Sequence, residues 1–227
     1  MRVAHPEADP SRSWSAVLFD LDGTLIDSAP GIVDRMHETL LRMGEPVPPD
    51  SELVALVGPP LREAFIALGM TPDRAEQAVA IHRGLAADQG PWTGAALFPG
   101  MLGLLTDLHE AGIPTALATS KSARQARLIV EHFELGELFR VVVGASEDDA
   151  LSAKADIIAA VLSGLEADGV SLDRPVLVGD RGYDLVGAAA NNVPSILVEW
   201  GYGSPAEAEG ALATVHSVDQ LRDLLLG

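Results

Sequence analysis

The chain has 227 residues, 48% of them hydrophobic, and a formal net charge of −18 at pH 7. This length predicts one hydrophobic core plus an insertion or a small second domain. The negative charge argues against nucleic acid or an anionic membrane surface as a partner. Because there is no cysteine, disulfides and thiolate metal sites are excluded. Any metal must be bound by oxygen or imidazole ligands, and a hard cation such as Mg²⁺ fits that set.

The N-terminal residues and the hydropathy pattern bear on localisation. No apolar stretch approaches membrane-spanning length, and the first residues are polar and interrupted by prolines, unlike a signal peptide. We therefore expect a soluble, cytoplasmic protein that does not bind membranes, with residues 1–14 as a flexible arm. The sequence is compatible with a monomer or a homodimer.

The segment from Ala16 to Ser28 carries the first chemical signal. An apolar run over residues 16–19 predicts a strand buried on both faces, and it ends in Asp20 and Asp22. Open α/β sheets bind ligands at the carboxyl ends of their strands, so these acids are expected in a site. Gly23 permits a turn that carries Asp22 over Asp20. A polar turn without a catalytic role can have the same Asp-Leu-Asp-Gly sequence after a strand, so the motif needs support from later parts of the chain.

Residues 29–95 are predicted to form a block of helices. The first helix begins near Ser28, which stands at an N-cap position, and ends near Gly44. Shorter helices are predicted over 53–57, 61–68 and 75–87. No strand is expected between them. The block is inserted into a core made of residues 15–28 and 96–227, and we expect it to form a separate helical domain.

From residue 98 onward, strands and helices alternate. Helices are predicted over 102–111, 123–133, 154–165 and 183–191, and strands over 114–119, 140–143, 175–178 and 195–198. Capping-box patterns at Ser204 and Ser217 predict two further helix starts. This alternation predicts an α/β fold with a doubly wound, Rossmann-like parallel sheet.

Polar groups follow several of the predicted strands. Thr119-Ser120-Lys121 follows one, and Gly179-Asp180 with Asp184 follows another; Lys154 begins the helix after a third. Taken singly, these residues are explained by helix caps or exposed side chains. All carboxyl ends of a parallel sheet lie at one edge, however, so these groups can converge with the first two acids. Their joint placement favours a site.

The basic residues are also informative. Of 15 Lys and Arg residues only Lys121 and Lys154 are lysines, and both lie next to predicted strand ends. Where nearly all basic residues are arginines, a lysine suggests a position that requires a compact point charge. Lys121 is predicted to face either a bound phosphate or the helical block. Arg62 and His37 are candidates for substrate selection, although amphipathic helices ordinarily carry such polar residues on their solvent-exposed face.

These motifs resemble, in order, the four motifs of the haloacid dehalogenase superfamily. They are Asp20-Leu-Asp22-Gly-Thr, the strand ending in Thr119, the downstream Lys154, and Gly179-Asp180-x-x-x-Asp184. The resemblance extends over nearly the whole chain, and the helical block is similar to the superfamily's first type of cap domain. The turns at 27–31, 57–61 and 201–204 are most similar to phosphoglycolate phosphatases and the related 5'-nucleotidases.

The resemblance implies catalytic roles for five residues. Asp20 is expected to be the nucleophile that attacks phosphorus and forms an aspartyl-phosphate. Asp22 is expected to protonate the leaving oxygen and then to activate water. Thr119, the amide of Ser120 at a helix N-terminus and Lys154 are expected to bind the phosphoryl oxygens.

The resemblance also implies Mg²⁺ as cofactor. Its expected ligands are the carboxylates of Asp20 and Asp180 and the backbone carbonyl of Asp22, with Asp184 bound directly or through water. The cation offsets the repulsion between an anionic nucleophile and an anionic ester. The six histidines show no metal-ligand spacing.

Within the superfamily, the sequence favours a phosphatase acting on a small phosphorylated metabolite. Dehalogenases do not need the second acid, Asp22, and phosphonate hydrolases use a cap lysine, which residues 29–95 lack. A sugar phosphomutase shares the Asp-x-Asp pair and remains an alternative. A non-catalytic binding protein is disfavoured because it would be expected to lose at least one of the catalytic residues. The sequence does not choose among phosphoglycolate, sugar phosphates and mononucleotides.

Overall fold

The computed structural model describes residues 14–146 and 150–227. Residues 1–13 of the expected flexible arm lie outside the described residues. Trp14, which was expected to be the last residue of that arm, instead packs against the core. Its Nε1 donates a hydrogen bond to the backbone carbonyl of Leu224 at 3.1 Å.

The described residues form helices and strands in the order that the sequence predicts, with three additional short strands. In chain order the elements are β1 (Ala16–Phe19), β2 (Ile26–Asp27), α1 (Ala29–Met43), α2 (Asp50–Val54), α3 (Leu61–Ala67), α4 (Pro72–Gln89), β3 (Ala96–Leu97), α5 (Met101–Glu110), β4 (Thr115–Ser122), α6 (Ala123–His132), β5 (Val141–Ala145), α7 (Lys154–Ala167), β6 (Pro175–Gly179), α8 (Gly182–Ala190), β7 (Ser195–Val198), β8 (Ala213–Val215) and α9 (Val218–Leu226). Two short 3₁₀ helices are η1 (Gly136–Leu138) and η2 (Pro205–Ala208).

Six strands form one sheet in the order β5-β4-β1-β6-β7-β8, and every neighbouring pair is parallel. The apolar strand β1 lies between β4 and β6, with Val17 opposite Thr115 on one side and Val176 on the other. All four of its residues are fully buried. This arrangement confirms the predicted doubly wound α/β fold.

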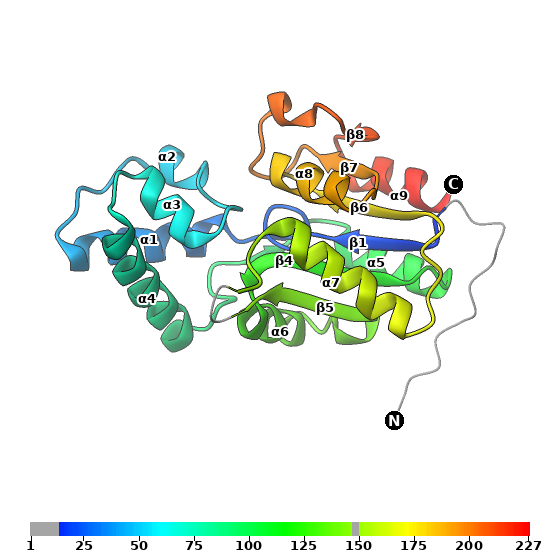
Figure 1. Cartoon of the computed structure of the whole chain (residues 1–227), viewed down its shortest axis with the longest axis horizontal. Coiled ribbons are helices and arrows are strands. Elements are labelled where there is room, and N and C mark those ends of the chain that lie inside the picture. The colour runs from blue at the N-terminus through cyan, green and yellow to red at the C-terminus, as the bar shows by residue number, and fades with distance from the viewer. Residues whose placement is uncertain (1–13, 147–149) are drawn as a thin grey trace.

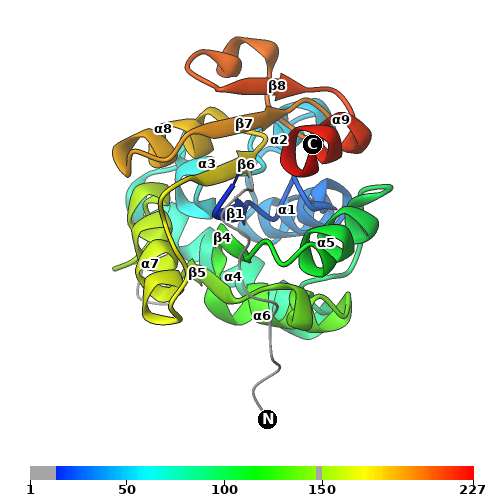
Figure 2. The same cartoon turned by 90° about the vertical axis from the view of Figure 1, so that its right-hand side faces the viewer.

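Helices cover both faces of the sheet, as Figure 2 shows: α7 and α8 lie on one face, and α5, α6 and α9 on the other. Successive residues of a strand point to opposite faces. Val17 and Phe19 accordingly pack in the cluster that includes α5, α6 and α9, whereas Ala16 and Leu18 pack with α7 and α8. Burial on both faces explains why β1 is a continuous apolar run rather than an alternating one.

The helices α1 to α4 form a separate layer beyond the end of the sheet at which β1 finishes (Figure 1). They have their own apolar core, in which Met36, Leu53 and Phe65 are buried. The chain leaves for this layer through β2 and returns through β3, and the two short strands pair antiparallel. We call the layer of α1–α4 the cap. The expected domain boundaries at 29 and 95 stay a prediction, but they lie next to β2 and β3, through which the chain passes between the sheet and the cap.

Several local expectations differ from the structure. Helix α2 begins at Asp50 rather than at residue 53. The capping box at Ser204 starts only the 3₁₀ helix η2, and β8 follows it where no strand was predicted. Strands β2, β3 and β8 have two or three residues each, so they arise from pairing with distant segments and leave little pattern in the sequence. Among the described residues, no helix is both long and apolar enough to span a membrane.

Candidate active site

Three carboxylates meet where β1 and β6 end. Asp20 follows β1, Asp180 follows β6, and Asp184 lies in the first turn of α8. One carboxylate oxygen from each lies within 4.8 Å of those of the other two, and all three residues are buried. The predicted convergence of residues separated by about 160 positions is therefore present.

Lys154, the first residue of α7, contacts this cluster. Its Nζ lies 2.5 Å from Asp20 Oδ1 and 2.7 Å from Asp184 Oδ1, and it donates to the carbonyl of Ala118 at 2.8 Å. Burial lowers the pKa of Lys154, but the Asp184 and Asp20 carboxylates outweigh it and hold the ammonium charged. A compact ammonium satisfies three acceptors in this small space, consistent with the prediction that this position requires a lysine.

The Asp180 carboxylate is held from several sides. It accepts hydrogen bonds from the amide of Tyr202 at 2.7 Å and from Thr24 Oγ1 at 3.4 Å. Gly23 has φ +79, and a Cβ there would lie 2.2 Å from Asp180 Oδ2; a Cβ at Gly201 would lie 2.4 Å from the same oxygen. Glycine is required at residue 23 both for its conformation and for this close approach.

The cluster carries more negative charge than its one lysine can balance. Burial, with the charges of Asp184 and Asp22, raises the pKa of Asp20 to about 7 although Lys154 opposes the shift. Burial and the two neighbouring carboxylates likewise raise the pKa of Asp180 well above its usual range. Like charges in a buried site favour the protonated form, and a bound cation reverses that preference. Three buried carboxylates with oxygen donors only are a suitable ligand set for a hard divalent cation.

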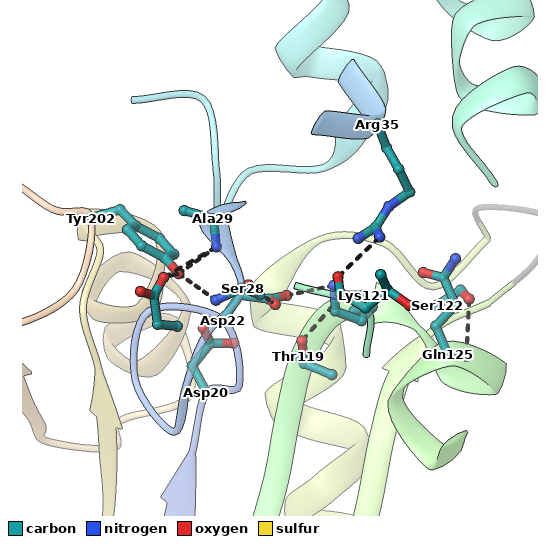
Figure 3. Close-up of polar contacts among 12 residues, drawn as sticks. Asp20, Asp22, Ser28, Ala29, Arg35, Thr119, Lys121, Ser122, Gln125 and Tyr202 are labelled. Atoms are coloured by element: carbon teal, nitrogen blue, oxygen red, sulfur yellow. Dashed lines mark hydrogen bonds and ion pairs between the residues drawn. The ribbon is translucent and has the colours of Figure 1, made fainter. Parts of the chain in front are cut away.

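Asp22 lies beside this cluster and faces the cap. It accepts a hydrogen bond from Ser28 Oγ at 2.5 Å, and its other oxygen lies 3.0 Å from Lys121 Nζ (Figure 3). Ser28 is the N-cap residue of α1, as expected, but its hydroxyl makes no cap hydrogen bond. The hydroxyl donates to Asp22 instead. Lys121 was predicted to face either a bound phosphate or the helical block; its ammonium pairs with the carboxylate of Asp22, and the choice between the two stays a prediction.

The segment expected to bind phosphoryl oxygens is the end of β4. Thr119 Oγ1 accepts a hydrogen bond from the amide of Lys121 at 3.1 Å, and Ser120 lines the cavity described below. The expectation that Thr119-Ser120 caps the next helix is wrong. Strand β4 continues to Ser122, whose Oγ accepts from the amide of Gln125 and caps α6. The Ser120 amide therefore lies in the strand, not at a helix N-terminus.

A cavity of about 590 Å³ lies between the cap and the strand ends. Asp22, Ser120 and Lys121 line it from the core, and the turn from Val57 to Leu61 lines it from the cap. Arg62 also lines it and pairs with Glu76 at 2.5 Å, but its side chain is 42% exposed, so it lies at the solvent-accessible edge of the cavity. His37 does not line the cavity; its Nε2 lies 3.0 Å from Asp50.

Two core residues hold the cap near the acids. Arg181, next to Asp180, donates to the carbonyls of Val57 and Ala55 in the cap and pairs with Glu207 at 3.1 Å. The Tyr202 hydroxyl donates to Asp27 at 2.8 Å and accepts from the amides of Ser28 and Ala29 at 2.7 and 2.9 Å. The same residue's own amide binds Asp180, so Tyr202 links the acid cluster to the start of α1.

Sequence reasoning missed the roles of Arg35, His82, Arg181 and Tyr202. Arg35 and His82 are buried inside the cap, and His82 lines the cavity. Arg35 lies three residues after Ile32, at the edge of the apolar stripe of α1, so periodicity alone does not show that it is buried. The loop at 201–204 was noted for its resemblance, but nothing in its pattern shows that the phenol reaches the cap.

Comparisons with known proteins agree with this geometry. The family model of haloacid dehalogenase-like hydrolases matches residues 17–198. The tyrosine-protein kinase PtkA of Mycobacterium tuberculosis (strain ATCC 25618 / H37Rv) is 39% identical over 222 residues, covering 96% of this chain and 75% of that protein. A 5'-nucleotidase of Pseudomonas aeruginosa is 32% identical, covering 93% and 94%, and a phosphoglycolate phosphatase of Rhodospirillum rubrum is 33% identical, covering 92% and 90%.

Solved structures give the same result. The crystal structure of a predicted phosphatase from Clostridium acetobutylicum superposes with a TM-score of 0.86 at 36% identity, covering 93% of this chain and 97% of that one. The sheet, the strand-end acids and these matches define the class as a haloacid dehalogenase-type hydrolase fold. The chain belongs to the haloacid dehalogenase-like hydrolase family, which confirms the resemblance found in the sequence.

Proposed function

We propose that this protein is a Mg²⁺-dependent phosphatase that hydrolyses a small phosphomonoester through an aspartyl-phosphate on Asp20. One observation carries the proposal. The Asp20 carboxylate, paired with Lys154, lies in a cluster with Asp180 and Asp184, and Asp22 lies next to it at the edge of the cap cavity. A nucleophile, a charge-neutralising lysine and an acid that faces the leaving group are the parts that phosphoryl transfer requires.

The proposed reaction has two displacements. An Asp20 oxygen attacks phosphorus, the bond from phosphorus to the alcohol oxygen breaks, and Asp22 donates its proton to that oxygen. Asp22 then accepts a proton from water as the water oxygen attacks phosphorus, and the bond from phosphorus to the Asp20 oxygen breaks, which releases inorganic phosphate and restores the Asp20 carboxylate. Ser28 and Lys121 hold the Asp22 carboxylate in place through contacts of 2.5 and 3.0 Å.

Charge neutralisation is the other requirement. Lys154 neutralises the negative charge that develops on the phosphoryl oxygens, while Thr119 and Ser120 bind them. The carboxylates of Asp20, Asp180 and Asp184, with the backbone carbonyl of Asp22, would hold Mg²⁺. When bound, the cation screens the nucleophile from the anionic ester and polarises the phosphoryl group.

The cap supports a small substrate. It covers the acids, and Arg181 and Tyr202 hold it there, which excludes bulky phosphates. Relatives named phosphoglycolate phosphatase and 5'-nucleotidase agree with a phosphorylated metabolite. We also propose that the protein binds neither nucleic acid nor membranes.

The test is phosphate release from a panel of small phosphomonoesters, with Mg²⁺ or with EDTA, using Asp20→Asn protein alongside. Metal-dependent release that the variant lacks is the expected result. If the folded, Mg²⁺-loaded protein releases no phosphate from any ester, the phosphatase proposal is wrong. Interconversion of sugar phosphates under the same conditions would favour the phosphomutase alternative.

A second candidate is phosphoryl transfer to a protein tyrosine. The 39% identity with a protein named tyrosine-protein kinase over nearly the whole chain favours it. The same nucleophile and lysine could handle a phosphoryl group that passes to a phenol rather than to water. Incubation with γ-labelled ATP and a tyrosine-containing protein distinguishes the two: transfer of label to tyrosine that exceeds phosphate release would favour the kinase.

A further inference from the structure

The cavity between the cap and the strand ends has more room than a phosphoryl group needs. Its volume of about 590 Å³ lies in the range of pockets that enclose whole drug-sized ligands. The proposed reaction places the phosphoryl group against Asp20 and the leaving oxygen in line on its far side, next to Asp22. Because Asp22 lines the cavity, the rest of the leaving group extends from there toward the cap. The cap surface that it meets therefore decides which leaving group is accepted.

The core side of the cavity is polar. Ser120, Lys121, Ser122 and Gln125 line it. Figure 3 shows the last three of these close together, where β4 ends and α6 begins. Their hydroxyl, amide and ammonium groups suit the phosphoryl group and the leaving oxygen. The core thus supplies the polar contacts that the reaction needs.

The turn of the cap at residues 56–61 presents an apolar surface to the same cavity. Leu56, Pro59, Pro60 and Leu61 line the cavity and are only half-buried, so apolar atoms remain exposed inside it. The two prolines have no backbone N–H, and this part of the turn therefore offers no amide donor to an anion or a hydroxyl. Covering exposed apolar surface is favourable, so the turn is complementary to an apolar group.

Contacts with the core fix this turn in place. Arg181 donates hydrogen bonds to the carbonyls of Ala55 and Val57. A Cβ at Gly58 would lie 3.2 Å from the Arg181 side chain, so the two segments pack closely. The proline rings restrict the backbone of the residues that follow. A rigid surface loses little conformational entropy when a ligand binds, and the turn is therefore preorganised for binding.

The charged residues that the cap contributes to the cavity cancel one another. They are two arginines and two glutamates, Arg62, Arg83, Glu63 and Glu76, and Arg62 pairs with Glu76 at 2.5 Å. His82 adds no charge, because burial first and then nearby cations lower its pKa to about 3. Over the residues that the structure describes, the cap side of the cavity thus has no net charge to attract an anionic leaving group. The net charge of −18 on the whole chain opposes one.

We propose that the leaving group of the substrate is uncharged and mainly apolar, and that it packs against the turn at residues 56–61. The inference rests on the proposed function, because that function places the leaving oxygen beside Asp22. It names the substrate class as a phosphate ester of a neutral, apolar alcohol that is larger than glycolate. The core binds the phosphoryl group through polar contacts, and the cap selects the alcohol through apolar contacts.

The test compares three esters of primary alcohols, in which the basicity of the leaving oxygen is similar: ethyl phosphate, benzyl phosphate and 4-carboxybenzyl phosphate. We expect kcat/KM for benzyl phosphate to exceed that for ethyl phosphate by about 100-fold, because the ring adds buried apolar contact. The carboxylate should lower kcat/KM relative to benzyl phosphate by about 10-fold, because burying an unpaired charge is unfavourable. Equal values for ethyl and benzyl phosphate, or a higher value for the carboxybenzyl ester, overturn the proposal.

Variants then assign the preference to the turn. In Leu61→Ala, the ratio of kcat/KM for benzyl over ethyl phosphate should fall about 10-fold, mainly through the benzyl ester. Leu68→Ala is the matched control, because Leu68 packs against the same cap core but does not line this cavity, and it should leave the ratio unchanged. Equal losses on both esters in Leu61→Ala would show a structural role and overturn the assignment. Leu61→Lys should raise kcat/KM for the carboxybenzyl ester relative to benzyl phosphate, and an unchanged ratio would contradict contact with this turn.

A binding measurement separates this inference from the proposed function. Calorimetric titration of Mg²⁺-loaded Asp20→Asn protein with ethyl and benzyl phosphate, at several temperatures, needs no turnover. Tighter binding of benzyl phosphate with a more negative heat-capacity change supports the apolar contact even if the wild type hydrolyses nothing. Equal affinities for the two esters contradict the inference even if hydrolysis is fast.

Discussion

The floor of the site and the cap wall above it are built differently. On the floor, Asp20, Asp180, Asp184 and Lys154 are each engaged by ion pairs or hydrogen bonds, and Asp20 directly follows the fully buried strand β1. On the wall, the turn from Val57 to Leu61 lines the cavity, and the ion pair there between Arg62 and Glu76 is about half exposed. The floor is thus organised by its own ion pairs and hydrogen bonds before the substrate arrives, whereas the wall is mainly an apolar turn. Preorganised charge suits the reaction.

The largest expected effect is on the floor. Asp20→Asn removes the nucleophile while keeping the side chain's shape, so kcat should fall at least about 1,000-fold. Thermal stability should be unchanged or higher, because one negative charge leaves a crowded buried cluster. Asp88→Asn, an exposed carboxylate on α4, is the control and should retain wild-type kcat. Steady-state kinetics with thermal denaturation of both variants checks this; wild-type turnover in Asp20→Asn would remove Asp20 from the mechanism.

Lys154 should be the next most sensitive position. Lys154→Met leaves Asp20 and Asp184 without their cation, and breaking such a buried pair costs about 3–5 kcal/mol of unfolding free energy. Lys154→Arg keeps the charge, but a planar guanidinium cannot occupy the position of an ammonium with three acceptors within 2.8 Å. We expect it to fold and to lose about 100-fold in kcat. Near-wild-type kcat in Lys154→Arg would show that charge alone suffices.

A glycine pair tests how tightly the floor is packed. Gly23 and Gly44 both have positive φ, but a Cβ at Gly23 would overlap Asp180, whereas nothing lies within 4 Å of a Cβ at Gly44. Gly44→Ala should therefore cost only the backbone strain, about 1–2 kcal/mol. Gly23→Ala should cost more and should also weaken the stabilisation that Mg²⁺ gives. Urea denaturation with and without Mg²⁺ measures both, and equal behaviour of the two variants would contradict the contact with Asp180.

The smallest effect is expected where the floor meets the cap. Tyr202→Phe removes the hydroxyl that accepts from the amides of Ser28 and Ala29, which should cost about 1–3 kcal/mol. Because the Tyr202 amide still binds Asp180, we expect KM to rise severalfold with little change in kcat. Tyr183→Phe, an exposed tyrosine, is the control and should leave KM unchanged. A fall in kcat alone would show that the phenol acts in the chemistry instead.

The sequence predicts the floor better than the wall for a physical reason. Strand ends of a parallel sheet must meet at one edge, so acids and lysines placed after strands could be assigned to one site before any coordinates were known. The N-cap of α1 was assigned correctly to Ser28, but the cap of α6 was expected at Thr119-Ser120, whereas strand β4 continues to Ser122 and this residue caps the helix. His82 lies on a helix, where periodicity separates buried from exposed positions but does not show which buried position faces a cavity.

The most direct test of the central claim is a single-turnover experiment with enzyme in excess over a ³²P-labelled ester, quenched in acid at successive times. The account predicts that label appears on the protein and then decays as phosphate is released. The bound label should be sensitive to hydroxylamine, as an acyl phosphate is, and absent from Asp20→Asn protein. Release of phosphate with no protein-bound label at any time, while the enzyme turns over, would contradict a covalent intermediate on Asp20.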